Sequence, residues 1–366
     1  MELADIALLT GPEGRQLLAD LPPYDERAAL AIGERLRRAG HSPDLVAAAL
    51  TQSRLRTRAA HRWGSAGADL LPRLLLTPDG AEQATRPTVA ALRAERYRRL
   101  GRDQAVADLG CGVGIDALAL ADAGLRVDAY DLDPVTAAVA VANAAATGHG
   151  EQINVTSADV TRMSAVATAQ YDAAFADPAR RRAGRRLLRP ETWSPPLSWV
   201  LDLPIVSLGV KVAPGLPHQR VRSETEFAVV SDGGDVVEAA LYRGALRQVG
   251  VTRSAMLLPA RDHVSDADLP ATPPPINPVG QYLHEPDGAV IRAGLVAAVV
   301  DAVDGWLIDP HIAYVSSNSD ATSPFLSSYQ IVDVLPFGLK RLRAYLRAEG
   351  VGHVVVKKRG SAIDVD

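Results

Sequence analysis

The stretch from residue 105 to residue 131, AVADLGCGVGIDALALADAGLRVDAYD, constrains the fold more strongly than any other part of the chain. Residues 105–109 form an apolar run of strand length, and three glycines at alternate positions follow it. Residues 116–123 have the composition of a helix and end at Gly124, a residue type that commonly terminates helices. A second strand is predicted over residues 126–130. The order strand, glycine turn, helix, strand predicts a nucleotide-binding βαβ unit in an open α/β sheet.

Two classes of ligand can bind such a unit, and the glycine spacing separates them. A dinucleotide site needs G-x-G-x-x-G, which brings the backbone against a pyrophosphate. Here the glycines are Gly110, Gly112 and Gly114, so the third comes one position early. Asp108 would be poorly placed beside a diphosphate, but it suits a ligand that carries an ammonium and a sulfonium group. Asp131 ends the second strand, where a carboxylate binds the ribose of a nucleotide.

The sequence DLGCGVG at residues 108–114 resembles motif I of the class I S-adenosylmethionine-dependent methyltransferases. Asp131 resembles the ribose-binding acid of this family, Asp159 the residue near the adenine amine, and Asp177-Pro178 the motif after the fourth strand. A glycine turn that served only packing would explain one of these motifs but not all four in order. The resemblance implies a Rossmann-like core of seven strands that binds S-adenosylmethionine. The implied cofactor-binding residues are Asp108, Gly110, Cys111, Gly112, Gly114, Asp131, Leu132, Asp159 and Asp177.

The bulk properties of the 366-residue chain limit the possible partners. Its length predicts two or three domains, and its formal net charge of −4 gives no attraction of the whole molecule to nucleic acid. Any such binding must come from local patches. The single cysteine excludes an internal disulfide, and the histidines lack metal-ligand spacing, so we expect no metal. No signal peptide or membrane-spanning run is evident, which makes a cytoplasmic location the expectation.

The chain shows shifts in composition that predict its domains. Residues 27–39 and 45–61 are predicted helices in an N-terminal region without strand alternation. Residues 231–234 carry a turn signal between two strands. We predict a helical N-terminal domain (1–85), a methyltransferase domain (86–258), a Pro-rich linker (259–284) and a C-terminal α/β domain (285–366).

The C-terminal domain is predicted to have a β-α-β order. Its expected elements are a helix over residues 289–303, a strand over 330–335, a basic helix over 338–348 and a strand over 352–357. This order, the helical start and the DPARR motif resemble an actinobacterial family of methyltransferases with a THUMP-like C-terminal domain. THUMP domains are RNA-binding modules of RNA-modifying enzymes, so the resemblance implies RNA, either tRNA or rRNA, as a partner.

A basic run follows Asp177-Pro178. Six arginines fall within ten positions: Arg180, Arg181, Arg182, Arg185, Arg186 and Arg189. In an open α/β sheet this loop borders the ligand site, and guanidinium groups suit phosphate oxygens. We expect the first five to contact RNA, with a solvated loop as the alternative. A second basic face, at Arg54, Arg56, Arg58 and Arg62, allows the same two interpretations, and the solvated one is favoured.

Methyl transfer is an in-line displacement, so the enzyme mainly positions a nucleophile and fixes its protonation state. Amino-directed methyltransferases carry Asp or Asn, then Pro, Pro and an aromatic residue, and the acid accepts a hydrogen bond from the exocyclic amine. Asp177 and Pro178 match this motif, whereas Ala179 and Arg180 do not, although a guanidinium could stack on a base instead. Our hypothesis is that Asp177 and Pro178 catalyse transfer to an exocyclic amine of an RNA base.

Other acceptors stay open at this point. Some pyrimidine C5 methyltransferases share the sequence D-P-A-R, but they need a cysteine nucleophile, and Cys111 lies in the cofactor loop. A ribose 2′-oxygen acceptor would use a Lys-Asp-Lys-Glu set, of which Asp177, Lys211 and Glu238 could supply part. Lys211, at the end of a predicted fifth strand, is either a substrate contact or a surface residue. The rival functions are a small-molecule or protein methyltransferase and a noncatalytic RNA-binding protein that retains the donor pocket.

Overall fold

Helix α4 (Pro43–Trp63) is the centre of the N-terminal helical region. It begins where Oγ of Ser42 accepts a hydrogen bond from the backbone N–H of Leu45, and its buried face packs against the neighbouring helices. Those helices are α1 (Leu3–Thr10), α2 (Pro12–Asp20), α3 (Glu26–Arg38) and α5 (Pro78–Gln83). The helices predicted over residues 27–39 and 45–61 are therefore confirmed as α3 and α4.

The computed structural model describes residues 1–182 and 185–357. Contacts between residues divide the chain into two units. The first unit comprises residues 1–226 and 238–248, and the second comprises residues 227–237 and those that follow residue 248. The helical region and a mostly parallel sheet therefore belong to the same unit.

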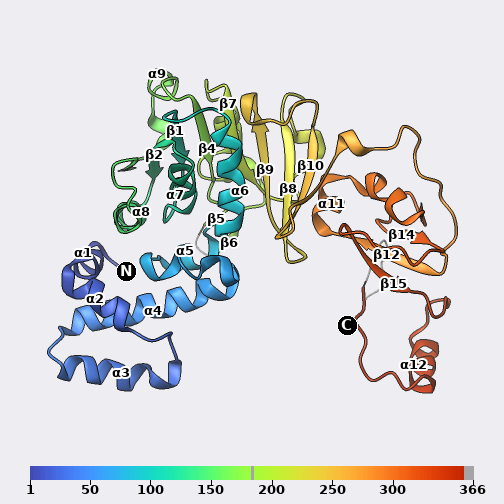
Figure 1. Cartoon of the computed structure of the whole chain (residues 1–366), viewed down its shortest axis with the longest axis horizontal. Coiled ribbons are helices and arrows are strands. Elements are labelled where there is room, and N and C mark those ends of the chain that lie inside the picture. The colour runs from blue at the N-terminus through green and yellow to red at the C-terminus, as the bar shows by residue number, and fades with distance from the viewer. Residues whose placement is uncertain (183–184, 358–366) are drawn as a thin grey trace. The chain divides into compact units, whose positions relative to one another are not determined.

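The sheet of the first unit has the strand order β9-β7-β4-β1-β2-β3 (Figure 1). Its strands are β1 (Ala105–Leu109), β2 (Arg126–Asp131), β3 (Ile153–Ser157), β4 (Ala173–Ala176), β7 (Ser207–Val212) and β9 (Asp235–Arg243), of which residues 239–243 pair with β7. All of these pairs are parallel except the β7–β9 pair. The loops after β1, β2, β3 and β4 therefore leave the sheet at one edge, where ligands of open α/β sheets bind.

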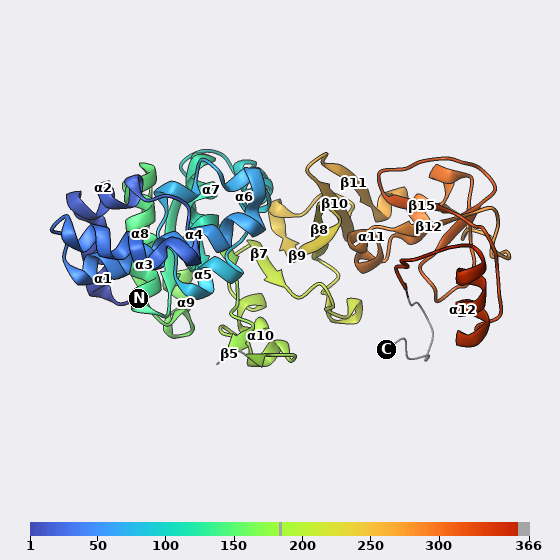
Figure 2. The same ribbon diagram turned by 90° about the horizontal axis from the view of Figure 1, so that it is seen from below.

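Helices cover both faces of this sheet. Figure 2 places α6 (Pro87–Arg98) and α7 (Ile115–Asp122) on one face and the short α10 (Leu197–Leu201) on the other. Helix α8 (Pro134–Thr147) follows β2 and packs on β3. Such coverage explains why β1 and β4 are apolar runs rather than alternating sequences, because both faces of each strand are buried.

The helical region lies against the carboxyl edge of the sheet (Figure 1). One link between them is Asn143 of α8, which is fully buried. Its side chain accepts a hydrogen bond of 2.7 Å from the N–H of Leu75 and donates bonds of 3.0 and 2.8 Å to the carbonyls of Leu75 and Val113. The segment that leads into α5 is thereby joined through Asn143 to the glycine turn.

The second unit contains two groups of strands. In the first group, β8 (Glu226–Asp232) is parallel to β10 (Arg253–Leu258), which pairs antiparallel with β11 (Asp262–Ser265). In the second group, four strands have the order β13-β14-β12-β15 and are antiparallel. These strands are β12 (Tyr282–Pro286), β13 (Trp306–Leu307), β14 (Val315–Ser317) and β15 (Leu326–Gln330). The α-helices described in this unit are α11 (Gly288–Ala293) and α12 (Leu339–Ala348).

Several predicted elements of this unit differ from those observed. The Pro-rich segment contains strand β11, because its backbone pairs with β10. The helix predicted over residues 289–303 stops at Gly294, whose φ is +69°, and 3-10 turns follow. The strand predicted over residues 330–335 ends at Gln330 as β15, and residues 352–357 form no strand. The basic helix predicted over residues 338–348 is confirmed as α12, as is the turn between β8 and β9.

Candidate functional site

The glycine turn after β1 has a backbone that only glycine adopts easily. Gly110, Gly112 and Gly114 have φ values of +89°, +56° and +92°. The N–H groups of Gly110 and Cys111 donate hydrogen bonds of 2.8 and 2.9 Å to the carbonyl of Tyr130 on β2. A Cβ atom at Gly110 would lie 2.9 Å from the carbonyl oxygen of Asp177. The turn therefore brings the ends of β1, β2 and β4 close together.

Asp131 is held at the end of β2 by two backbone donors. Its Oδ2 accepts a hydrogen bond of 2.9 Å from the N–H of Gly112, and its Oδ1 accepts one of 2.9 Å from the N–H of Asp133. Burial raises the pKa of this carboxyl, while the two hydrogen bonds oppose the shift. The neighbouring Leu132 side chain is 62% exposed. A carboxylate and an apolar side chain thus border the same turn, as the ribose and the base of a nucleotide require.

Asp108 is a buried carboxyl beside the glycine turn. It is fully buried, and neither of its side-chain oxygens has a hydrogen-bond partner among the residues that the structure describes. Burial raises its pKa to about 7, and Arg93 opposes the shift. A buried carboxyl without a partner is costly unless a ligand supplies one. The ammonium group of an amino-acid ligand is such a partner, so the site fits a donor of this kind.

Asp159 lies after β3, at the same edge of the sheet. Its Oδ1 accepts hydrogen bonds of 3.0 Å from the N–H and 2.6 Å from the hydroxyl of Thr161. These bonds lower the pKa of Asp159, so it is ionised at neutral pH. The structure therefore places Asp108, Asp131 and Asp159 at the carboxyl ends of three adjacent strands, as the sequence predicts.

Asp177 and Pro178 follow β4, with the backbone N–H of Asp177 bonded at 3.1 Å to the carbonyl of Leu109. Oδ2 of Asp177 lies 2.7 Å from Nζ of Lys211 at the end of β7. Lys211 is only 5% exposed, so its interpretation as a surface residue is wrong. The structure brings Asp177 and Lys211 together as an ion pair on the inner side of the strand ends.

A chain of buried polar contacts continues from this pair. Nζ of Lys211 donates a hydrogen bond of 3.3 Å to Oγ1 of Thr85, which donates one of 2.6 Å to Oδ2 of Asp116 on α7. Asp116 pairs with Arg93 of α6, and Arg93 pairs with Glu238 of β9. Glu238 therefore forms an ion pair with an arginine. A Lys-Asp-Lys-Glu set for a 2′-oxygen acceptor would instead need a second lysine at this place.

Three buried residues of this polar chain, Thr85, Arg93 and Asp116, are not predicted from the sequence. A signal for Arg93 was present in the spacing of its helix. Val89, Ala90, Ala94 and Tyr97 of α6 are buried, and position 93 lies on the same helical face. No comparable pattern marks Thr85, because it lies between two helices.

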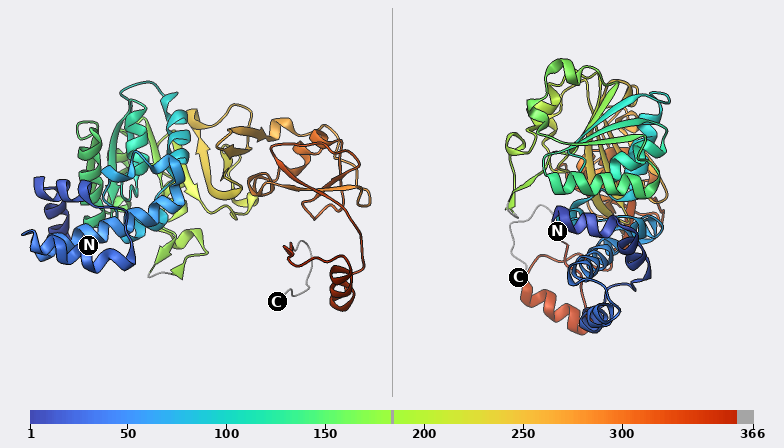
Figure 3. Two further views of the ribbon diagram at one scale, coloured as in Figure 1. Left: turned by 60° about the horizontal axis from the view of Figure 1, so that its bottom comes forward. Right: turned by 90° about the vertical axis from the view of Figure 1, so that its left-hand side faces the viewer.

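The arginine run after Asp177-Pro178 forms a short hairpin, not an irregular loop (Figures 2 and 3). Strand β5 (Arg181–Arg182) pairs antiparallel with β6 (Arg185–Arg186), and the N–H of Leu187 donates a bond of 2.7 Å to the carbonyl of Arg180. Arg185 is exposed and Arg180 is half-buried. The side chains of Arg181, Arg182 and Arg186 lie outside the described ones. The backbone therefore presents this run as a defined element beside Asp177.

The arginines of α4 contact their own region. Arg56 donates a hydrogen bond of 2.9 Å to the carbonyl of Leu74, and burial lowers its pKa to about 10. Arg62 donates bonds to two carbonyls of the segment around α5, and Arg58 pairs with Glu82. These contacts favour a structural role for this face over RNA binding.

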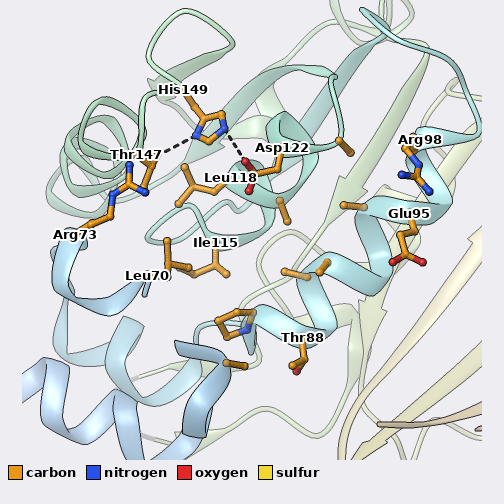
Figure 4. A pocket seen from close by; sticks show the side chains of 17 residues that line it. Leu70, Arg73, Thr88, Glu95, Arg98, Ile115, Leu118, Asp122, Thr147 and His149 are labelled. Atoms are coloured by element: carbon orange, nitrogen blue, oxygen red, sulfur yellow. Dashed lines mark hydrogen bonds and ion pairs between the residues drawn. The ribbon is translucent and has the colours of Figure 1, made fainter. Parts of the chain in front are cut away.

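A groove of about 590 Å³ lies on the face of the sheet that carries α6 and α7, between these two helices, residues 66–73 and residues 147–149 (Figure 4). His149 crosses one side of it, with Nε2 2.9 Å from Oδ1 of Asp122. None of the site residues predicted from the sequence lines this groove.

The described residues contain no group of three or more side chains that could hold a metal ion. They also contain no helix that is both long and apolar enough to cross a membrane.

Comparisons with known proteins agree with this geometry. A family model described as a methyltransferase domain matches residues 106–186, one described as THUMP domain-like matches residues 326–366, and a domain of unknown function (DUF8688) matches residues 2–59. The crystal structure of a "putative methyltransferase" from Porphyromonas gingivalis W83 superposes with a TM-score of 0.68 at 18% identity. It covers 95% of this chain and 87% of its own, which confirms the predicted fold class.

Relatives of higher identity show the family. The chain is 35% identical, over 342 residues, to proteins of two Mycobacterium tuberculosis strains, CDC 1551 / Oshkosh and H37Rv, each described as an uncharacterized S-adenosylmethionine-dependent methyltransferase. The match covers 91% of this chain and 89% of each relative. The predicted cofactor, S-adenosylmethionine, and the predicted actinobacterial relationship are confirmed. The chain therefore belongs to the S-adenosylmethionine-dependent methyltransferases.

Proposed function

We propose that the enzyme methylates a base of structured RNA, with an exocyclic amine as the favoured acceptor. The observation that carries this proposal is the direct passage from Asp177-Pro178 into the arginine hairpin of β5 and β6. The proposed catalytic residues Asp177 and Pro178 are therefore close in the chain to a run of permanently charged arginines. A small apolar acceptor would not need such charge, whereas RNA phosphates do.

In this proposal the residues at the strand ends hold the donor. Asp108 binds its ammonium group, Asp131 its ribose and Asp159 the adenine amine. Leu132 packs on the adenine, and the backbone and side chains of Gly110, Cys111, Gly112 and Gly114 surround the amino-acid end. The unpartnered Asp108 carboxyl and the open backbone of the glycine turn support this arrangement.

The acceptor is placed by Asp177 and Pro178. Oδ2 of Asp177 is occupied by Lys211, which leaves Oδ1 to accept a hydrogen bond from the amine. This bond orients the nitrogen lone pair along the line of attack on the methyl carbon. When bound, the donor would supply the methyl group: the sulfur would keep the electron pair of the broken carbon–sulfur bond and leave as S-adenosylhomocysteine, and the methylated amine would release one proton to solvent. Arg180, close to Pro178 in the chain, replaces the aromatic residue of the usual motif and can stack on the base.

The C-terminal part of the chain supports RNA as the substrate class. Residues 326–366 match a THUMP domain-like model, and α12 lies within this stretch. This helix has no buried residues, and it carries Lys340, Arg341, Arg343 and Arg347. A basic helix of this kind offers a second set of phosphate contacts in addition to the hairpin.

The first test measures RNA binding as a function of salt. We expect replacement of Arg180, Arg181, Arg182, Arg185 and Arg186 by Gln to weaken binding of total RNA. The slope of log affinity against log salt should decrease by roughly 0.7 to 0.9 for each phosphate that the variant no longer binds. The matched control replaces five exposed arginines elsewhere: Arg35, Arg37, Arg38, Arg98 and Arg99. Equal effects of the two sets would favour a small-molecule or protein methyltransferase.

The second test identifies the modified nucleoside. Total RNA from a deletion strain and its parent is digested and compared by mass spectrometry. We expect one methylated nucleoside to be missing, and to return when the wild-type gene but not Asp177→Ala is supplied. An unchanged set of nucleosides, combined with normal donor binding, would favour the noncatalytic RNA-binding rival.

A further inference from the structure

The polar chain behind Asp177 has no role in the proposed function so far, yet its members are buried. Thr85, Arg93, Asp116, Lys211 and Glu238 are each less than 9% exposed. Burial of the four charged groups among them costs free energy unless well-aligned ion pairs and hydrogen bonds offset the loss of water. One end of the chain is the side chain of the proposed catalytic acid.

We propose that Lys211 is a positioning residue that fixes the Asp177 carboxylate, with Thr85 and Asp116 holding the lysine in place. The sequence suggested Lys211 as a substrate contact, but its ammonium group points inward. Nζ is 2.7 Å from Oδ2 of Asp177 and 3.3 Å from Oγ1 of Thr85, so two of its three donors are used. This inference rests on the proposed role of Asp177 at the acceptor.

The contacts explain how the carboxylate is oriented. Asp177 itself is partly open, with 27% of its side chain exposed, whereas the Lys211 side chain is 7% exposed. The amine of an acceptor base can therefore reach Asp177 more easily than an RNA phosphate can reach Lys211. The ion pair at Oδ2 restricts rotation of the carboxylate and leaves Oδ1 for the acceptor. A displaced carboxylate would no longer align the acceptor with the methyl group, and small misplacements of this kind cost about 100-fold in rate.

Thr85 joins this lysine to the donor turn. It receives a hydrogen bond from Lys211 and passes one of 2.6 Å to Asp116, which lies in the first turn of α7 directly after the glycines. Donor site and acceptor acid are thereby linked by one hydroxyl that comes from the N-terminal region. Three other ionisable side chains lie around Lys211 and Asp116. Arg93 of α6 and Glu238 of β9 pair with each other, and Asp108 lies on β1.

The test uses the full chain, total RNA from a deletion strain as acceptor, and S-adenosylmethionine as donor. For Lys211→Met we expect kcat to fall about 100-fold, with KM for RNA and the dissociation constant of S-adenosylhomocysteine changed less than about threefold. A KM for RNA that rises while kcat is kept would show that Lys211 contacts the substrate, and would overturn the proposal. An unchanged kcat would overturn it as well.

A second pair of variants serves if Lys211→Met does not fold. Thr85→Val keeps the shape of the side chain and removes the hydroxyl, whereas Thr85→Ser keeps the hydroxyl. We expect Thr85→Val to lower kcat by about 10-fold, because it removes the hydroxyl that accepts a hydrogen bond from Lys211 and donates one to Asp116, and Thr85→Ser to restore most of it. Equal loss in both variants would indicate only a packing role for Thr85 and would contradict the proposal.

A readout that needs no acceptor separates this inference from the proposed function. Crystal structures with S-adenosylhomocysteine should show the Asp177 carboxylate displaced in Lys211→Met and in its wild-type position in Thr85→Ser. An undisplaced Asp177 in Lys211→Met overturns the inference even if RNA is the substrate. If instead wild-type enzyme transfers no methyl group to RNA, the proposed substrate fails, while the position of Asp177 still decides the role of Lys211.

Discussion

The backbone N–H of Gly112 donates a hydrogen bond of 2.9 Å to Oδ2 of Asp131, across a separation of 19 residues in the chain. This bond joins the glycine turn after β1 to the carboxylate after β2. The two parts of the proposed donor site are therefore one structural element, and a change in either part should disturb the other.

The approach of Gly110 to Asp177 gives a first prediction. A Cβ atom at Gly110, where φ is +89°, would lie 2.9 Å from the Asp177 carbonyl oxygen. We expect Gly110→Ala to reduce the free energy of unfolding by about 3 kcal/mol or more, since it adds a clash to the backbone strain. Gly148, with φ of +88° and nothing within 4 Å, is the matched control. Gly148→Ala should cost about 1 to 2 kcal/mol, for strain alone. Equal losses in urea unfolding would contradict the close approach.

The buried Asp108 predicts how the stability of the ligand-free protein depends on pH. Its pKa is about 7 in the folded protein and near 3.8 in the unfolded chain, so between these values only the folded state holds the proton. The free energy of unfolding should therefore fall as pH rises, by at most about 1.4 kcal/mol per pH unit from this group. Asp108→Asn removes this contribution. Urea unfolding at several pH values between about 4.5 and 7.5 measures this effect. We expect the free energy of unfolding of wild type to fall relative to that of Asp108→Asn as pH rises. A constant difference between the two proteins across this pH range would refute the prediction.

The buried Arg93–Glu238 pair predicts a large effect of losing one charge. Glu238→Gln leaves the Arg93 guanidinium with less compensation in a fully buried place. We expect the free energy of unfolding to fall by about 3 to 5 kcal/mol. The exposed pair of Glu34 and Arg38 is the control, since Glu34→Gln should change the free energy of unfolding by less than about 1 kcal/mol. Similar effects at the two pairs would mean that the buried contact is not formed as described.

Much of the first unit could be predicted from the sequence because its signals are local. The glycine turn, the helix after it and the acid at the end of β2 lie within one stretch of 27 residues, from 105 to 131. The parallel strands then bring Asp108, Asp131, Asp159 and Asp177 to one edge of the sheet. Residues at the ends of successive strands therefore lie close together in space.

The remaining features depend on contacts between distant residues. The partners of Lys211 come from the end of β4 and from the segment before α6, which lies 126 residues away, and no sequence pattern links them. The hairpin of arginines has no turn signal of the usual kind. In the second unit, β11 lies in the Pro-rich segment that composition alone predicted to be a linker, and it pairs with β10. Pairing partners, not local propensity, decided these elements.

The central claim is that the turn at Gly110–Gly114 and the carboxylate of Asp131 hold the methyl donor. Isothermal titration calorimetry with S-adenosylhomocysteine tests it most directly, with Asp131→Ala as the probe and the exposed Asp122→Ala as the control. We predict one S-adenosylhomocysteine bound per chain in wild type and Asp122→Ala, and an affinity about 100-fold weaker in Asp131→Ala, which loses charge-assisted hydrogen bonds to the ribose. No heat with wild type, or equal affinities for all three proteins, would contradict the claim.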